Sequence, residues 1–184
     1  MARLTFLECF AQYCETLALD GNVAELGVFQ GEFAKEINKC FSKCICYLFD
    51  TFEGFDQRDL ATEDRDIQEL GGHLKNTSVE LVMSKMTFYN MVDIRQGWFP
   101  QSADGLENEK FKFVNIDTDL YDSILSGLEF FYPKMVVGGV ILVHDYFSMG
   151  YVGVKKAVDE FCKKRGIFAM PIGDDMSIAI QKKG

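Results

Sequence analysis

Glycines and an acidic residue stand at a spacing that suits the binding of a nucleoside. Residues 23–31 read VAELGVFQG, an apolar run that contains Glu25 and passes into a turn bounded by Gly27 and Gly31. Glycines allow the backbone to approach a ligand closely, and a helix that begins after the turn offers free N–H groups. The spacing E-x-G-x-x-x-G differs from the G-x-G-x-x-G of dinucleotide binders, which seat a pyrophosphate. The pattern therefore favours a nucleoside without phosphates, with turn geometry alone as the alternative.

A second carboxylate lies farther along the chain, where Asp50 ends the apolar run of residues 44–49. In α/β nucleoside binders, a carboxylate at the end of the second strand accepts hydrogen bonds from both ribose hydroxyls. An aspartate after a strand is also a common turn residue or helix cap. Combined with the glycine turn, Asp50 favours S-adenosylmethionine (SAM) as the ligand.

Length and charge restrict the class of protein. The 184 residues suit one domain spanning 1–184, and 28 acidic against 19 basic residues give a net charge of −9. Such a charge disfavours a nucleic-acid partner. No apolar run is long enough to span a membrane, and the first residues do not resemble a signal peptide, so we expect a cytoplasmic protein without a membrane partner. Six cysteines without a C-x-x-C pair predict reduced core thiols rather than a metal site on Cys40, Cys44 and Cys46.

The apolar periodicity predicts alternating helices and strands. A short N-terminal helix is expected over about residues 3–18, with later helices over about 31–41, from the capping box at 77–80, up to Pro133, and up to Gly166. This order predicts a doubly wound, mostly parallel α/β sheet of Rossmann-like type with an antiparallel edge strand, and ligands bind such sheets at the carboxyl ends of the strands. The predicted strands cover residues 22–26, 44–50, 92–95, 111–116, 139–143, 168–172 and 176–180.

One long polar segment interrupts this order. Residues 57–76 carry many charges and the pair Gly71 and Gly72. Long loops of this kind in compact domains tend to be functional, so the segment is predicted to be a mobile lid, with a solvated face as the alternative.

Four polar side chains are expected to converge beside the nucleoside site. Asp117 and Asp119 follow the fourth predicted strand, and His144 and Asp145 follow the fifth. Parallel neighbours end side by side, so these groups are expected to face one pocket. An aliphatic hydroxyl needs a base within hydrogen-bond reach and gains from a Lewis acid on its oxygen, which such a cluster can supply. Strand-end aspartates that merely cap helices are the alternative.

The motifs at successive strand ends resemble those of the macrocin O-methyltransferase family. The matching blocks are VAELGVFQG at 23–31, YLFDTFEGF at 47–55, NTS at 76–78, IDTDLY at 116–121, YPK at 132–134, GGV at 138–140 and DY at 145–146. Members of this family transfer a methyl group from SAM to sugar hydroxyls of macrolide and aminocoumarin natural products. The resemblance implies a class I methyltransferase that methylates a hydroxyl of a sugar or related small molecule, from a glycan precursor or a secondary metabolite.

The resemblance also implies roles for individual residues. Glu25, Gly27, Gly31, Asp50 and Asp117 become cofactor residues. Gln96, Gly97 and Trp98 would lie near the adenine, although Trp98 also suits a core position.

By the same resemblance, Asp117 and Asp145 hold a magnesium ion and Asp119 is the general base. The chain departs from the family at His144, where a second acidic residue is common. Imidazole is an unusual ligand for magnesium and shifts the preference toward manganese, with His144 as a third ligand. Without an ion, His144 is the better base because its ordinary pKa lies nearer neutrality, so the base remains open between Asp119 and His144.

The chain also departs from the family in the length of its N-terminal segment. Only about twenty residues precede the first predicted strand, which leaves three expectations: an open acceptor pocket, a pocket completed in a homo-oligomer, or a shortened chain. Together with His144, this feature also suits a SAM-binding partner or sensor protein without turnover.

Overall fold

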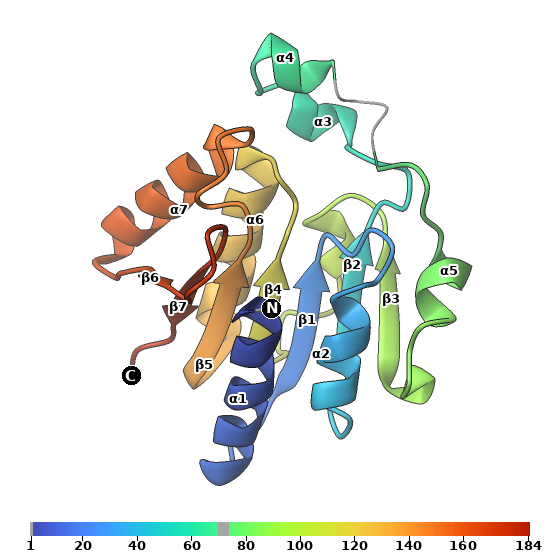
Figure 1. Ribbon diagram of the computed structural model, residues 1–184, viewed down its shortest axis with the longest axis vertical. Coiled ribbons are helices and arrows are strands. Elements are labelled where there is room, and N and C mark those ends of the chain that lie inside the picture. The colour runs from blue at the N-terminus through green and yellow to red at the C-terminus, as the bar shows by residue number, and fades with distance from the viewer. Residues whose placement is uncertain (1, 70–73) are drawn as a thin grey trace.

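The computed structural model describes residues 2–69 and 74–184 and contains a seven-stranded sheet with helices on both faces (Figure 1). The strands are β1 (Asn22–Leu26), β2 (Cys46–Asp50), β3 (Val92–Gln96), β4 (Phe111–Ile116), β5 (Met135–Val143), β6 (Met170–Pro171) and β7 (Ile178–Gln181). The helices are α1 (Ala2–Thr16), α2 (Ala34–Cys40), α3 (Gln57–Leu60), α4 (Arg65–Gln68), α5 (Val79–Met83), α6 (Tyr121–Phe131) and α7 (Val152–Arg165). Three 3-10 turns complete the described elements: η1 (Tyr89–Met91), η2 (Gln101–Ala103) and η3 (Tyr132–Lys134).

The sheet has the order β3-β2-β1-β4-β5-β7-β6. Strands β1 to β5 pair in parallel, and β7 is antiparallel to both β5 and β6. The expected doubly wound, mostly parallel sheet with an antiparallel edge is confirmed. Its carboxyl ends meet at one edge, as required for a shared site.

The sheet has a separate apolar core on each face because successive strand side chains point to opposite sides. On β5, Ile141 and Val143 pack with α6 and α7, whereas Leu142 packs with α1 and α2. Phe131 and Phe113 are fully buried in these two cores. Since burial of one such side chain is worth about 1.5–3 kcal/mol, the two cores together hold the strand ends in place.

Several boundaries follow the local signals in the sequence. Ser78 caps α5 by accepting a hydrogen bond from the Leu81 N–H, and Gly166 ends α7 with a left-handed φ of 60°. Helix α1 ends at Thr16, two residues before the predicted end. No helix in the described ranges 2–69 and 74–184 has the length and apolar character needed to cross a bilayer.

Strands β2, β3 and β7 differ from the expected ranges by one or two residues at one or both ends, whereas β5 and β6 differ more. β5 begins at Met135 rather than near residue 139, because Met135 already pairs with Phe111 of β4; the register then shifts before Phe113 pairs with Val140. β6 is only two residues long, Met170–Pro171. Proline lacks an N–H for strand pairing, which limits this edge strand.

The polar segment after β2 contains two short helices rather than a continuous loop. α3 and α4 form an arm above the carboxyl ends of the strands (Figure 1). Asp56 caps α3 by accepting from the Arg58 N–H. The predicted Gly71 and Gly72 pair lies outside the described residues, and the mobility of the arm stays a prediction.

Candidate active site

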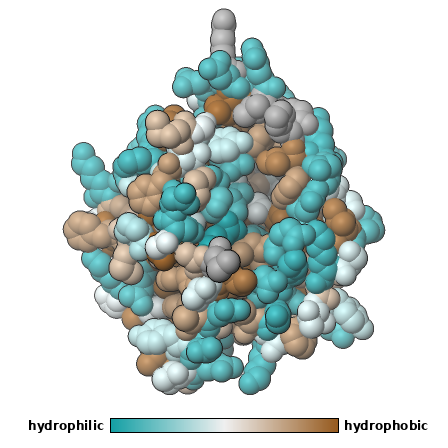
Figure 2. Space-filling model, viewed as in Figure 1, coloured by the Kyte–Doolittle hydropathy of each residue, from teal (hydrophilic) through white to brown (hydrophobic). Residues whose placement is uncertain are grey.

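A hollow opens at the carboxyl ends of β1, β2, β3 and β4. Its empty volume is about 650 Å³, part of it open to solvent. In the space-filling view, hydrophilic residues gather near the centre of this face with apolar residues around them (Figure 2). Six of the predicted site residues line the hollow: Gly27, Asp50, Gly97, Trp98, Asp117 and Asp119.

Both glycines of the first turn are required by close packing. Gly27 has a φ of +87°, and a Cβ there would lie 2.1 Å from the carbonyl oxygen of Asp117. Gly31 has a φ of +79° and is buried against Val82 of α5, where a Cβ would lie 3.2 Å from a methyl group. Gly27 therefore brings the β1 turn directly against the end of β4, while Gly31 joins the turn to α5 and does not line the hollow.

The Asp50 carboxylate holds the same turn. One oxygen accepts from the backbone N–H groups of Val28 and Phe29, both at 2.8 Å, and the other accepts from the Phe52 N–H at 2.8 Å. Phe29 and Phe52 adopt positive φ angles of 48° and 56°, which these bonds help to maintain. About one of the four acceptor positions of the carboxylate remains for a ligand. Asp50 thus shapes the hollow besides lining it.

The residues after β3 form the far end of the hollow. The N–H of Gly97 donates to the Asp50 carbonyl at 2.9 Å, and Trp98 donates from Nε1 to Asp59 Oδ1 at 3.0 Å. Arg58 lies over the Trp98 ring at 4.1 Å from its centroid. The sequence allowed Trp98 either to contact a ligand or to lie in the core. The side chain is half-buried and lines the hollow, so it has features of both positions. Gln96 is exposed and does not line the hollow.

The α3–α4 arm is joined to the start of α6 by polar contacts. Glu63 accepts from the Tyr121 N–H at 2.6 Å, at the start of α6. Thr62 donates to Asp122 Oδ2 at 2.6 Å. The first turn of α6 is therefore capped by Glu63 from the arm. The alternative interpretation of the strand-end aspartates as helix caps does not hold for α6, because neither Asp119 nor Asp122 caps it.

Asp59 is an unexpected acidic group in this region. Burial raises its pKa to about 6, although the hydrogen bond from Trp98 acts in the opposite direction. The sequence offers no signal for Asp59 or Glu63 beyond the charge density of their segment, because their partners are distant along the chain.

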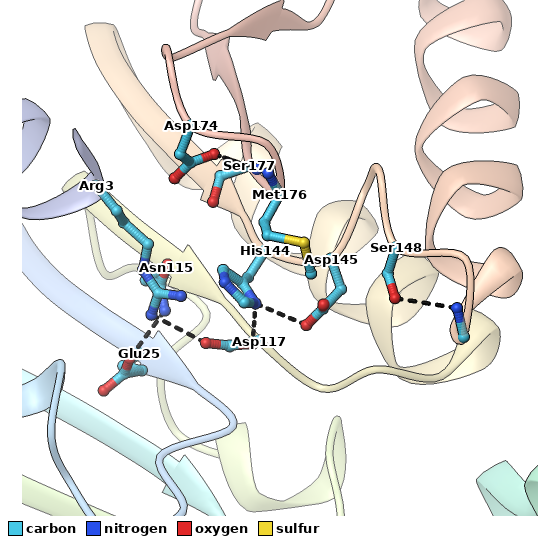
Figure 3. A network of polar contacts seen from close by, with 11 residues as sticks. Arg3, Glu25, Asn115, Asp117, His144, Asp145, Ser148, Asp174, Met176 and Ser177 are labelled. Atoms are coloured by element: carbon cyan, nitrogen blue, oxygen red, sulfur yellow. Dashed lines mark hydrogen bonds and ion pairs between the residues drawn. The ribbon is translucent and has the colours of Figure 1, made fainter. Parts of the chain in front are cut away.

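At the other end of the hollow, Asp117 meets His144 and Asp145, which do not themselves line the hollow as Asp117 and Asp119 do. His144 Nδ1 lies 2.6 Å from Asp145 Oδ2 and 3.2 Å from Asp117 Oδ1 (Figure 3). Asp117 Oδ2 accepts from the guanidinium of Arg3 at 2.9 Å. The imidazole thus bridges two carboxylates, and an arginine from α1 that sequence reasoning did not identify completes the group.

The charges in this cluster shift its pKa values strongly. Burial lowers the pKa of His144, but hydrogen bonds to Asp117 and Asp145 outweigh it and raise the pKa to about 10. Burial would raise the pKa of Asp117, yet His144 and Arg3 bring it below its ordinary value. Asp119 has a pKa well above its ordinary value because of burial and the neighbouring charges of Asp117 and Asp145. As the residues stand, imidazolium is the stable form of His144 at neutral pH.

Glu25 lies on the α1 side of the sheet and does not line the hollow. It is 2 % exposed, accepts from Asn115 Nδ2 at 2.8 Å, and leaves its other oxygen, Oε2, without a partner. Burial raises its pKa to about 8. Figure 3 shows Glu25, Asn115 and Arg3 on one side of Asp117, with His144 and Asp145 on the other. Its predicted contact with the cofactor stays a prediction.

The cluster contains donors for a divalent cation. One ligand atom each from Asp117, His144 and Asp145 lies within 4.8 Å of the others, and the described part of the chain has no further group of three such residues. The three cysteines considered above therefore form no such group. Two carboxylate oxygens and one imidazole nitrogen fit a divalent ion, with manganese or a similar transition ion favoured over magnesium.

Comparisons with known proteins identify the family to which the chain is similar. The profile of the family described as Macrocin-O-methyltransferase (TylF) matches residues 1–181. The chain is 28% identical over 152 residues to the 8-demethyl-8-(2,3-dimethoxy-alpha-L-rhamnosyl)-tetracenomycin-C 4'-O-methyltransferase of Streptomyces olivaceus, covering 73% of this chain and 58% of that protein. It is 27% identical over 176 residues to the mycinamicin III 3''-O-methyltransferase of Micromonospora griseorubida, covering 85% of this chain and 67% of that protein. The chain thus spans less than two thirds of the tetracenomycin enzyme.

Solved structures show the same fold. The O-methyltransferase NovP superimposes with a TM-score of 0.79 at 24% identity, over 100% of this chain and 80% of that chain. The calicheamicin methyltransferase CalS11 superimposes with a TM-score of 0.75 at 15% identity, over 97% of this chain and 78% of that chain. The fold is therefore that of class I O-methyltransferases.

Proposed function

Since the chain belongs to the macrocin-O-methyltransferase (TylF) family, we propose that it transfers a methyl group from SAM to a hydroxyl of a sugar or related small molecule. The observation that carries this proposal is the single hollow that joins the glycine turn and Asp50 at one end to Asp117 and Asp119 at the other. The relatives named for 4'-O- and 3''-O-methylation support a sugar-like acceptor.

The order of the strands suggests how the cofactor lies. We place the adenine at Gly97 and Trp98 after β3, with Gln96 at the rim. The ribose lies at Asp50 on β2, and the sulfonium lies between Gly27 on β1 and Asp117 on β4. This order follows the sheet sequence β3-β2-β1-β4, so one extended ligand can contact all four strand ends.

Methyl transfer needs an acceptor hydroxyl that loses its proton as the new bond forms. The oxygen attacks the methyl carbon, the bond from that carbon to sulfur breaks, and the proton passes to a base, so catalysis consists of positioning and proton removal.

We propose Asp119 rather than His144 as this base. Asp119 lines the hollow, whereas the imidazole of His144 faces Asp117 and Asp145. Burial and neighbouring charges also raise the pKa of Asp119 above its ordinary value, which makes its carboxylate a stronger base, while the His144 pKa of about 10 leaves no free lone pair on the bridging nitrogen.

We further propose that Asp117, His144 and Asp145 can hold a divalent cation, magnesium or more favourably manganese, which would bind only as the imidazole of His144 gives up its proton. When bound, such an ion acts as a Lewis acid on the acceptor oxygen. Metal analysis of the purified protein, followed by activity measurements in excess chelator, tests this part. Full activity in a protein freed of metal would refute it.

The central experiment is a test of binding followed by a test of turnover. Calorimetry should detect binding of SAM and S-adenosylhomocysteine but not of NAD. Mass spectrometry of a panel of nucleotide sugars and glycosides incubated with SAM should detect a methylated product. Binding of SAM without methylation of any acceptor would favour a SAM-binding partner or sensor protein.

The cellular location and assembly are further parts of the proposal. A cytoplasmic location and a homo-oligomer remain our expectation. Cell fractionation and light scattering of the purified protein test them separately from the chemistry.

A further inference from the structure

Arg3 occupies a defined position beside the hollow. Its guanidinium donates to Asp117 Oδ2 at 2.9 Å and lies over the Phe33 ring at 4.0 Å from the centroid. The side chain is only 16% exposed. The contact with Phe33 and the ion pair with Asp117 hold the guanidinium at two points, so the group is positioned before any ligand arrives.

This arginine has more donors than its contact with Asp117 uses. A guanidinium carries five N–H groups. Within residues 2–69 and 74–184, Asp117 is the acceptor that Arg3 contacts. The planar fork of the remaining groups suits a second carboxylate.

The surroundings of Arg3 also contain a buried acceptor without a partner. Glu25 Oε2 has no hydrogen-bond partner although Glu25 is 2% exposed. Arg3 is the leading charged neighbour that lowers the pKa of Glu25, so the two side chains interact. The Arg3 guanidinium beside the Asp117 carboxylate has the charge pattern that complements an α-amino acid zwitterion, and Glu25 adds an unpaired buried oxygen nearby.

The direction of the hollow brings a ligand to this position. A nucleoside with its base at Trp98 and its ribose at Asp50 directs its 5′ substituent across Gly27 toward Asp117, because the strands that carry these residues lie in that order. Asp117 is the residue that Arg3 contacts. The 5′ substituent of SAM ends in an α-amino acid.

We propose that Arg3 binds the α-carboxylate of the methionyl end of SAM, with the α-ammonium group directed toward Asp117. This inference rests on the proposed function, because it assumes that SAM is the ligand. It assigns α1 a direct part in cofactor binding, besides its packing on the sheet. Asp117 can serve both neighbours, since Arg3 contacts Oδ2 and His144 faces Oδ1.

Calorimetry with two ligands tests the assignment, using SAM and decarboxylated SAM, which lacks only the carboxylate. The wild-type protein should bind SAM about tenfold to a hundredfold more tightly, the range for a charge-assisted contact. Arg3→Gln should weaken SAM by a similar factor and leave the affinity for decarboxylated SAM within about twofold. Arg3→Lys should recover only part of the loss, because an ammonium group lacks the fork.

Arg58→Gln is the matched control. Arg58 also stacks on an aromatic ring and pairs with an aspartate, but at the Trp98 end of the hollow. Any effect of Arg58→Gln should be equal for both ligands, because both carry the same adenine. Circular dichroism and thermal melting establish that each variant is folded.

The other outcomes overturn the inference. Equal weakening of both ligands by Arg3→Gln would show that Arg3 acts through Asp117 or the fold. If the Arg3 variants do not fold, the wild-type comparison still decides, since equal affinity for the two ligands refutes a carboxylate contact. Failure of the wild-type protein to bind SAM at all would instead refute the proposed function.

Discussion

The floor of the hollow and the arm above it are held in different ways. The floor consists of the carboxyl ends of the strands, where Phe49 of β2 and Ile116 of β4 are fully buried. The arm consists of two four-residue helices, α3 and α4, and its described side chains include one buried apolar residue, Leu60. It is joined to the rest of the protein by Asp59, Thr62 and Glu63.

Because of this difference, the floor determines the stability of the fold and the arm can control the access of ligands to the hollow. Two apolar cores fix the floor, so a change there costs free energy of folding. The three hydrogen bonds that join the arm each have a carboxylate acceptor and are worth about 1.5–3 kcal/mol, and the arm has a single buried apolar side chain among its described residues, so it can open locally while the sheet stays folded. Lids that admit ligands are drawn from such weakly held segments.

The largest effect is expected when the floor is broken at Gly27. Gly27→Ala would place a Cβ 2.1 Å from the Asp117 carbonyl oxygen at a φ of +87°. We expect a loss of about 3 kcal/mol or more in the free energy of unfolding, measured by urea denaturation, together with loss of SAM binding. Gly105→Ala is the control, because Gly105 has a φ of +86° with no atom within 4 Å of the added Cβ. Equal losses in the two variants would contradict the role of close packing.

A smaller effect is expected at Asp50, which holds the turn of the floor. Asp50→Ala removes the acceptor of three backbone N–H groups, those of Val28, Phe29 and Phe52. We expect SAM affinity to fall by roughly 1.5–3 kcal/mol in calorimetry, the range for hydrogen bonds to a charged group. Glu53→Ala, an exposed change in the same segment, should leave the affinity unaltered. Unchanged SAM affinity in Asp50→Ala would refute the assignment of the nucleoside site.

A change at Glu63 should affect the arm and leave the floor unaltered. Glu63→Gln weakens the acceptor for the Tyr121 N–H, so the arm should open more often. We expect amide hydrogen exchange over residues 57–69 to accelerate by about a factor of ten, equivalent to about 1.4 kcal/mol, with the sheet amides unaffected.

Ligand binding provides the complementary measurement on the arm. S-adenosylhomocysteine with an acceptor should slow the exchange of the arm in the wild-type protein. Glu69→Gln, a change at an exposed residue of the same segment, is the control for Glu63→Gln and should leave the exchange of the arm unaltered. Strong protection of the arm in the ligand-free wild type would argue against a lid.

The smallest effect concerns the pH dependence of the arm at Asp59. Burial raises its pKa from 3.8 to about 6, so the folded state binds the proton more tightly than the unfolded state. The contribution to stability is therefore greatest below about pH 4 and declines as the pH rises to about 6. Asp59→Asn keeps an acceptor for Trp98 and should show less of this decline in urea denaturation between those pH values. Parallel pH profiles for the two proteins would contradict the shift.

The sequence alone determined the floor of the site. β1 and β4 begin and end at the predicted residues because each is an apolar run bounded by turn residues. Gly27, Asp50 and Asp117 could be placed together because parallel strands end at one edge of the sheet. Local periodicity and the parallel rule require no knowledge of distant contacts, so they suffice for this part.

Only the tertiary structure decided the contacts that complete the site. Arg3 meets Asp117 across 114 positions of the chain, and Trp98 meets Asp59 across 39. The bridging of Asp117 and Asp145 by His144, with its raised pKa, likewise depends on side-chain directions at two strand ends. Such contacts leave no periodic signal in the sequence, because a single polar side chain on a helix or loop finds its partner only after the two apolar cores have packed the elements together.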